Sequence, residues 1–327
     1  MKNKGLFSFC MKAIILLAIV LVVDKVVGFA FLKIKDCGLK TNPECLWMKT
    51  PYVVEKMDAD MIIVGSSRAV HHYVPSILED SLGVSVYNCG QDGCFFLYQN
   101  CIINMVLDRY RPKTIIWDIQ PGCFNVLGDE REYQNIRYLS PYYEKSPWAT
   151  GYINSEERLS SLKMKCRMFA YNSKLHYFLL PLVVRGIPMK NGYIPLPSEG
   201  YEYPELSSDY ADCSEYESNM DKLGLFASTI ERCQTESVEI LIVVSPCFIT
   251  ANNAYLGAIA DLQKVAAESG CPLYDYSNLL LTEPNKFYDN CHLNHNGAVA
   301  FTEMIINQHL QQSHTRTARG IYAISEN

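Results

Sequence analysis

Short apolar runs alternate with longer stretches of helical periodicity along most of the chain. The short runs predict buried strands at about 61–65, 84–88, 113–117, 238–244 and 271–275. The stretches between them predict helices at about 72–82, 94–110, 219–235 and 253–269. Strands that alternate with helices are typical of βαβ units. We therefore expect an α/β fold, a three-layer sandwich around a mostly parallel sheet of about five strands.

A different pattern occupies the N-terminus, where residues 13–32 are apolar except for Asp24 and Lys25. As a helix this stretch would be about 30 Å long, the thickness of a bilayer's hydrocarbon core. We expect a membrane anchor at 13–32 behind a basic tail at 1–12. A cleaved signal peptide is the alternative, because 13–23 alone has the length of its apolar region. The two charges either face a partner or mark a shortened span.

The alternation is interrupted at 125–216, a long insertion that is helical around 155–183 and rich in Tyr, Pro and acidic residues. We expect it to form a lid or side wall of one domain that extends from 33 to 312. Its aromatic side chains either stack on sugar rings or pack the loop; they are Tyr133, Tyr142, Tyr143, Trp148, Tyr193, Tyr201 and Tyr203. The polar tail at 313–327 lacks periodicity and is expected to be mobile.

Composition and charge narrow the classes of function. The chain has 327 residues, 49% of them hydrophobic, which is enough for a large core, and a formal net charge of −6. No basic stripe or nucleic-acid motif occurs, so we expect no nucleic-acid partner. Orientation across a membrane is not decided by charge, because lysines both precede and follow the apolar stretch.

Thirteen cysteines occur without a Cys-x-x-Cys pair. Most are expected to be small buried apolar residues. Cys37 and Cys45 are the nearest candidates for a local disulfide. Cys291, Cys89 and Cys94 lie near candidate chemistry, as reactive thiols or as packing residues.

The candidate chemistry begins at the end of the first predicted strand, where Met61-Ile-Ile-Val-Gly-Ser-Ser-Arg68 places Ser67 in a turn. Near the C-terminus, Asp289-Asn-Cys-His-Leu-Asn294 precedes a helical pattern. A serine nucleophile needs an imidazole to take its proton, and the imidazole needs a carboxylate to fix its tautomer. Ser67, His292 and Asp289 are suited to these three roles.

These motifs resemble those of the SGNH/GDSL hydrolase superfamily. Gly65-Ser66-Ser67 matches its first block with Ser66 in the Asp position, and Asp289-Asn290-Cys291-His292 matches its last block. The Gly-Ser-Ser-Arg form is most similar to a membrane-anchored branch that includes acyl-transfer proteins of teichoic-acid D-alanylation and alginate O-acetylation. The resemblance implies that Ser67, Asp289 and His292 are catalytic and that 33–312 is the catalytic domain.

The resemblance also implies an oxyanion hole. Val86-Tyr-Asn-Cys-Gly-Gln-Asp-Gly93 puts Gly90 where the family uses a glycine N–H, and Ser67 would supply a second backbone donor. The family's third block, Gly-x-Asn-Asp, is missing, since the chain reads Trp117-Asp-Ile-Gln-Pro121. Asn88 or Gln120 would then replace the side-chain donor.

Further polar residues follow the predicted strands at the edge where α/β sheets bind ligands. Arg68 either holds the turn or contacts an anionic substrate. Asp118 is either a functional carboxylate or a turn cap, and with Gln120 it completes the possible substrate contacts. No ligand spacing supports a metal or cofactor, so His71 and His72 are expected to be surface histidines.

The combined pattern predicts a serine-dependent esterase or O-acyltransferase that acts through an acyl-enzyme on acyl, mainly acetyl, esters of a cell-surface glycan. The anchored branch implies an extracytoplasmic catalytic domain and a membrane-bound acyl donor protein as partner. The alternative is a noncatalytic glycan-binding or assembly protein that keeps the fold, and the missing third-block asparagine supports it.

Overall fold

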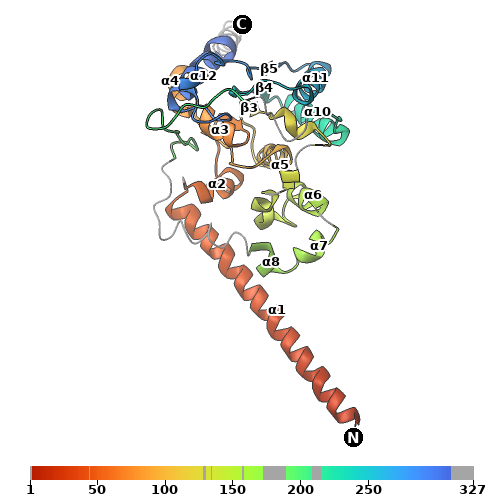
Figure 1. Ribbon diagram of the computed structural model, residues 1–327. Coiled ribbons are helices and arrows are strands. Elements are labelled where there is room, and N and C mark those ends of the chain that lie inside the picture. Colours follow the sequence, from red (N-terminus) through yellow and green to blue (C-terminus); the bar gives the residue numbers. More distant parts are fainter. Residues whose placement is uncertain are drawn as a thin grey trace, which may run out of the picture. The chain divides into compact units, whose positions relative to one another are not determined.

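The computed structural model describes residues 2–43, 45–127, 130–133, 135–156, 158–171, 189–207 and 215–310. The predicted tail at 313–327 and the predicted helix beyond 171 lie outside the described residues. The chain forms two compact units (Figure 1). One contains residues 1–51 and 137–186, and the other contains residues 52–136 and 187–327. Part of the predicted insertion therefore belongs with the N-terminal segment.

The larger unit is built on a five-stranded, all-parallel sheet in the order β2-β1-β3-β4-β5. The strands are β1 (Met61–Val64), β2 (Val86–Asn88), β3 (Thr114–Asp118), β4 (Glu239–Val244) and β5 (Leu273–Asp275). Each lies within two residues of a predicted strand. The α/β prediction is confirmed, and so is the parallel sheet of five strands.

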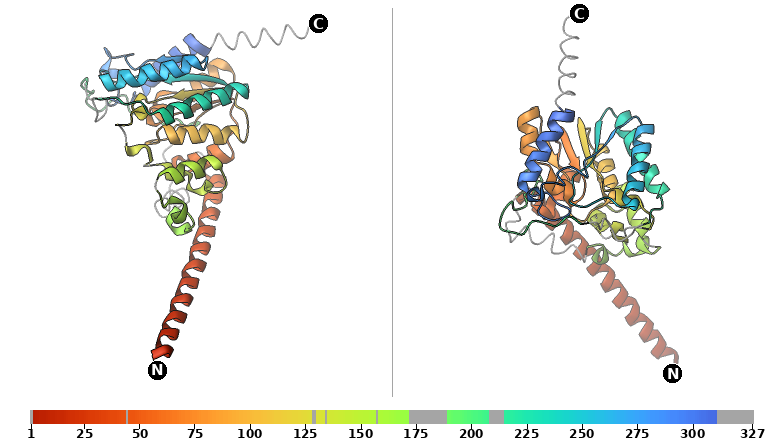
Figure 2. Two further views of the ribbon diagram at one scale, coloured as in Figure 1. Left: turned by 90° about the vertical axis from the view of Figure 1, so that its right-hand side faces the viewer. Right: turned by 45° about the horizontal axis from the view of Figure 1, so that its top comes forward.

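Helices cover both faces of this sheet (Figure 2). They are α3 (Ser67–His72), α4 (Pro75–Leu82), α5 (Phe96–Leu107), α10 (Met220–Thr235), α11 (Asn253–Glu268) and α12 (His295–Ile305). Local sequence sets several of their ends. Asn219, Asn252 and Asn294 cap α10, α11 and α12 by accepting a backbone N–H of the first turn. Gly83 ends α4 at φ 67°, a conformation that favours glycine.

Alternate residues of each strand face opposite layers, as pleating requires. Ile63, Ile116 and Val243 pack in one buried cluster with Phe301 of α12. Trp117 faces the other layer, where its ring lies 5.4 Å from Phe226 of α10. Almost every residue of β1 to β4 is buried, which explains why these strands are mainly apolar rather than alternating; the edge strand β5 is partly exposed.

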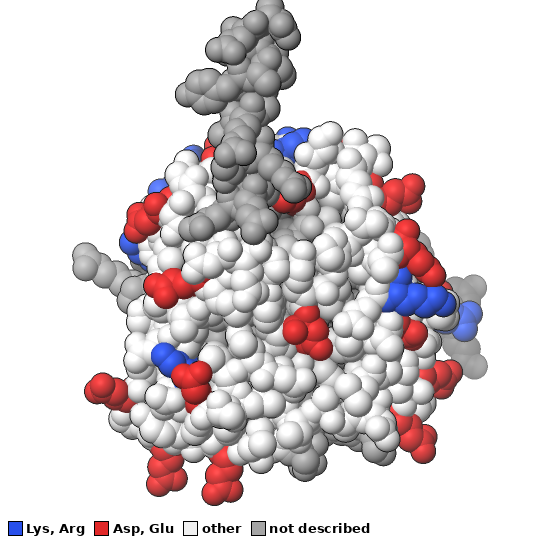
Figure 3. All heavy atoms as spheres, turned by 90° about the horizontal axis from the view of Figure 1, so that it is seen from above, with Lys and Arg blue, Asp and Glu red and all other residues white. Residues whose placement is uncertain are grey.

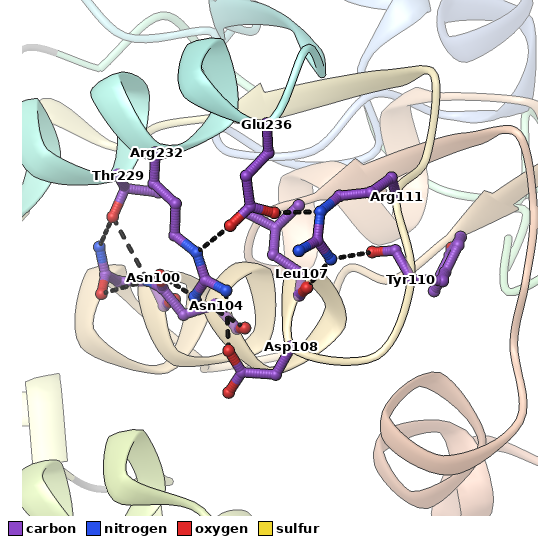
Figure 4. A network of polar contacts seen from close by, with 9 residues as sticks. All are labelled: Asn100, Asn104, Leu107, Asp108, Tyr110, Arg111, Thr229, Arg232 and Glu236. Carbon is purple, nitrogen blue, oxygen red and sulfur yellow. Dashed lines mark hydrogen bonds and ion pairs between the residues drawn. The ribbon is translucent and has the colours of Figure 1, made fainter.

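A polar network joins α5 to α10 (Figure 4). Arg232 donates to Asp108 at 2.7 Å and to Glu236 at 2.8 Å. Asn100 donates to the Thr229 hydroxyl at 2.6 Å. Asp108 and Glu236 precede β3 and β4, so this network lies at the amino ends of the strands.

Shorter helices complete the larger unit and its borders. They are α2 (Lys49–Glu55), the 3-10 helices η2 (Pro121–Phe124), η3 (Glu130–Tyr133) and η6 (Pro284–Lys286), and the π-helical turn η7 (Ile306–Leu310). The 3-10 helix η4 (Ile136–Tyr142) lies almost entirely in the smaller unit. On the face shown in Figure 3, acidic side chains are spread around the rim, and among the described residues basic ones are few.

The smaller unit is dominated by α1 (Lys2–Thr41), a helix longer than the predicted anchor at 13–32. It also contains η1 (Leu46–Met48), α6 (Pro147–Glu156), α7 (Ser160–Lys163) and α8 (Arg167–Tyr171). By length and composition α1 can cross a membrane, and a signal sequence near the N-terminus would pass the same test.

Candidate active site

Ser67 lies where β1 turns into α3, at the carboxyl end of the central strands. The turn is tight because a Cβ on Gly65 would lie 2.5 Å from the Ala69 Cβ. Only glycine leaves room for α3 to start this close to the sheet. Ser67 is thereby fixed as the first residue of a short helix.

Asp289 and His292 lie in the loop between η6 and α12. The Asp289 carboxylate accepts the backbone N–H groups of Cys291 and His292, each at 2.8 Å. The Tyr288 N–H in turn donates to the His292 carbonyl at 2.8 Å. These bonds form a tight turn that holds the carboxylate against the imidazole of the residue three positions later.

The structure brings Ser67, His292 and Asp289 together. The Ser67 Oγ is 2.7 Å from His292 Nε2, and His292 Nδ1 is 2.9 Å from both carboxylate oxygens of Asp289. A carboxylate accepts only, so the Nδ1–H donates to Asp289 and leaves the Nε2 lone pair facing the hydroxyl. This is the geometry that general-base activation of a serine requires.

The charges of the site favour an ionised Asp289. Burial opposes ionisation, but the hydrogen bond and charge of His292 and the two backbone N–H groups outweigh it and lower the pKa of the Asp289 carboxyl. Its side chain remains 47% exposed and that of His292 22% exposed. Ser67 is also partly exposed, so all three residues are in contact with solvent.

His72 forms a second connection between α3 and the Asp289–His292 loop. Its Nε2 accepts the N–H of Leu293 at 3.0 Å, so the ring proton sits on Nδ1 and donates to the Ser245 Oγ at 3.0 Å. Complete burial, with smaller contributions from the charges of His292, Arg68 and His71, lowers the pKa of His72 well below its usual value. His72 is thus a neutral side chain that fixes the residue next to His292.

Asn88, a predicted oxyanion donor, has a different role. Its side chain is fully buried, and its amide donates to the carbonyls of Ala69 at 2.6 Å and Tyr73 at 3.3 Å. Its carbonyl oxygen accepts the Gly90 N–H at 3.0 Å. Because its amide donates to carbonyls in and directly after α3, the prediction that Asn88 faces the oxyanion is wrong.

Gly90 lies close to the site, although its N–H donates to Asn88. A Cβ at Gly90 would lie 2.8 Å from the Ala69 Cβ and from the Val70 nitrogen, so close packing against α3 explains the glycine. The Ser67 N–H belongs to the first turn of α3, where helical N–H groups lack an intrahelical acceptor. Of the two predicted backbone donors, Ser67 is therefore better placed to act without rearrangement.

Arg68 and Asp118 are buried, 2% and 1% exposed, and face each other at 3.9 Å. Arg68 donates to the carbonyls of Ile119 at 2.9 Å and Ser245 at 3.4 Å. Burial raises the pKa of Asp118, and the charge of Arg68 opposes that rise. Burial and these internal partners favour the structural alternative for both residues, which hold the turn from the side away from solvent.

Gln120 is partly exposed directly after β3 and precedes η2, so it remains available as a polar contact.

His71 and His72 are buried, which corrects the prediction of surface histidines. His71 Nδ1 lies 2.8 Å from the Ile194 carbonyl, and its ring stands edge-on to that of His292 at 5.5 Å. The segment around Ile194, which covers His71, lies more than a hundred positions away in the sequence. No pattern near His71 predicts that this segment covers it.

Within the described part of the chain, no group of three or more His, Cys, Asp or Glu side chains is arranged to hold a metal ion. Cys37 is exposed and Cys45 is buried, and neither forms a disulfide, so the disulfide alternative is wrong for this pair. Cys89 and Cys94 are buried, and Cys291 is an exposed thiol beside His292.

Three residues around the site were not predicted to support it. They are His72, which was expected at the surface, and Ser245 and Tyr288. Tyr288 is 38% exposed, and its ring lies 5.0 Å from that of Tyr201. Tyr201 donates to the Phe287 carbonyl at 2.9 Å and has Tyr203 beside it at 5.8 Å. Of these residues, Tyr288 could have been placed near the site from the sequence, because it directly precedes Asp289.

No family model matches the chain, and no curated protein matches it. Among solved structures, it is similar to a proposed acylhydrolase from Bacteroides fragilis, at 11% identity and a TM-score of 0.40, over 82% of this chain and 94% of that one. It is also similar to an acetyl xylan esterase, at 10% identity and a TM-score of 0.39, over 76% of this chain and 100% of that one.

Proposed function

We propose that the chain is a serine-dependent esterase or O-acyltransferase that acts on acyl esters of a cell-surface glycan. The observation that carries the proposal is the contact chain from Ser67 Oγ through the His292 ring to Asp289, with distances of 2.7 and 2.9 Å. The motifs around these residues also resemble those of the SGNH/GDSL superfamily.

In the proposed reaction His292 Nε2 takes the proton of the Ser67 hydroxyl while Oγ bonds to the ester carbonyl carbon. The tetrahedral intermediate then breaks its bond to the leaving alcohol, which receives the proton from His292, and Ser67 keeps the acyl group. In the second half, water or a sugar hydroxyl attacks the acyl-enzyme with His292 again as base. Water gives hydrolysis, and a sugar hydroxyl gives transfer.

The developing oxyanion needs hydrogen-bond donors placed beforehand. The Ser67 N–H supports this role because it lies in the first turn of α3. A contribution from Gly90 requires its N–H to turn away from Asn88 when substrate binds. Gln120 lies in the segment 117–121, at the position of the family's third block. Its side chain is partly exposed and is the remaining candidate for a side-chain donor to the oxyanion.

The tyrosines beside the catalytic loop support a carbohydrate substrate. Tyr203 is 50% exposed and Tyr288 38% exposed, and both pack against Tyr201. Exposed aromatic rings with a polar end suit stacking on sugar rings at a wet surface. The Asn290 side chain donates to the Glu205 carbonyl at 2.6 Å, which fixes this tyrosine segment to the turn that contains Asp289 and His292.

The apolar part of α1 supports a membrane anchor, and the resemblance to the anchored branch is the basis for proposing that the larger unit lies on the extracytoplasmic side. An anchored enzyme can receive its acyl group from a membrane-bound donor protein, which favours transfer over hydrolysis. The proposed acyl group is acetyl, the smallest that the resemblance suggests.

Labelling with a fluorophosphonate probe tests the proposal. The probe is expected to modify Ser67 in the full-length protein, to leave Ser67→Ala unlabelled, and to react far more slowly with His292→Ala. A folded protein that stays unreactive, or that is labelled equally well after His292→Ala, would overturn the proposal.

A noncatalytic glycan-binding protein is the second candidate. It is favoured by the missing third-block asparagine and by the Gly90 N–H, which is already bonded to Asn88. This candidate predicts glycan binding that survives Ser67→Ala together with an absence of fluorophosphonate labelling.

A further inference from the structure

The surroundings of α1 change at Asp24. Every residue from Gly5 to Val23 is exposed. From Asp24 onward a buried stripe begins, spaced by four and three residues: Asp24, Gly28, Phe31, Lys35 and Gly38. That spacing places the stripe on one side of the helix. Within its own unit, α1 therefore packs on described residues only from Asp24 onward.

The first part of this stripe, from Asp24 to Phe31, packs on the segment 158–171, which contains α7 and α8 (Figure 1). Asp24 accepts the N–H of Met168 at 2.8 Å. A Cβ on Gly28 would lie 2.7 Å from the Arg167 Cβ. These contacts fix the segment beside α1 immediately after the fully exposed apolar stretch ends.

The same segment exposes apolar and basic side chains together. Leu159, Leu162 and Met168 are 55%, 63% and 45% exposed. The segment contains no acidic residue between 158 and 171, although the chain has a net charge of −6. Its basic residues are Arg158, Lys163, Lys165 and Arg167. Exposed apolar residues among cationic ones are typical of surfaces that lie on anionic lipid.

The contact with Met168 determines where a bilayer fits on α1. A span at 13–32 would put Asp24 deep in the hydrocarbon and would carry the irregular turn at 164–166 into it, which a bilayer core does not accept. A span at 6–23 is about 27 Å long, close to the core thickness of about 30 Å. The long side chain of Lys12 can then extend to the bilayer surface on the N-terminal side of the span.

We infer that residues 158–168 form a membrane-interface segment of this protein. Leu159, Leu162 and Met168 enter the boundary between lipid headgroups and acyl chains, and Lys163 and Lys165 contact lipid phosphates. The bilayer core ends at Asp24. The inference rests on α1 as a membrane anchor, and it does not depend on the proposed catalysis.

Photo-cross-linking of the full-length protein tests the inference. A benzophenone amino acid replaces Leu162, and separate variants carry it at Leu17 in the apolar part of α1 and at Ser228, an exposed position on α10. Each variant is reconstituted in vesicles of phosphatidylcholine and phosphatidylglycerol, and lipid adducts are measured by mass spectrometry. Adducts are expected at Leu162 and Leu17, but not at Ser228.

Adducts at Leu17 without adducts at Leu162 would overturn the interface segment while leaving the anchor intact. A cross-link from Leu162 to a second protein or a second copy of the chain would also overturn it. Absence of adducts at both positions would remove the anchor and the inference together. With Lys163→Gln and Lys165→Gln, the adduct yield at Leu162 should fall about fivefold per lysine at low ionic strength; an unchanged yield would overturn the phosphate contacts.

Discussion

Replacing His72 tests whether the catalytic loop is held from inside the protein. His72→Phe keeps the ring volume close to that of the imidazole but removes the acceptor for Leu293 N–H and the donor to Ser245. A buried N–H left without an acceptor costs about 1–3 kcal/mol. We expect the free energy of unfolding to fall by about that amount, measured by urea unfolding with tryptophan fluorescence.

The same substitution should lower kcat, because Leu293 directly follows His292. A displacement of the imidazole by about 1 Å is expected to reduce kcat about a hundredfold, with little change in KM for a small ester. His72→Gln is the matched control, because its amide oxygen can accept the Leu293 N–H and should restore much of kcat. A destabilised His72→Phe protein with unchanged kcat would show that His72 is merely structural and refute the positioning role.

The pH dependence of stability gives a second readout of His72. Its pKa is lowered in the folded state, so below a pH of about 6.5 the unfolded chain binds a proton that the folded protein does not. Stability should therefore fall as the pH drops below that value, by at most about 1.4 kcal/mol per pH unit from this group. His72→Gln should lack this part of the slope, and an identical slope in both proteins would contradict the assignment.

Three further predictions concern other parts of the larger unit. Asp289→Asn should lower kcat by about 10²–10⁴-fold with little effect on KM, because the amide no longer fixes the His292 tautomer; steady-state hydrolysis of a small ester measures this, and an unchanged kcat would contradict it. Tyr203→Ala with Tyr288→Ala should raise KM for an acetylated oligosaccharide but not for a small ester, and equal effects on both substrates would argue against stacking. Arg232→Met should lower the free energy of unfolding by about 1–3 kcal/mol in urea titrations without changing kcat, because the network lies at the opposite edge of the sheet from Ser67; a loss of activity at full stability would contradict it.

The fold was predictable because each strand is a short apolar run between turn signals, and because burial on both faces demands that pattern. The convergence of Ser67 with His292 was predictable from the resemblance of their two motifs to the first and last blocks of the SGNH/GDSL superfamily. Asp289 was predictable from its spacing to His292, which a single turn brings together.

The burial of the residues behind Ser67 was not predictable. Arg68 and His71 are covered by segments more than fifty and more than a hundred positions away, and no local pattern shows which segment covers a charge. The role of Asn88 depends on the carbonyls of Ala69 in α3 and of Tyr73 directly after it, which accept from its amide. The pairing of 137–186 with the N-terminal segment depends on contacts such as that of Asp24 with Met168, which the periodicity of neither segment reveals.

The acyl-enzyme offers the most direct test of the proposed nucleophile. The full-length protein is mixed with an acetyl ester, quenched in acid within the first turnovers, and digested for peptide mass spectrometry. The proposal predicts one acetyl group on the peptide that contains Ser67, and its absence in His292→Ala. An acetyl group on another residue, or ester turnover that persists in Ser67→Ala, would contradict it.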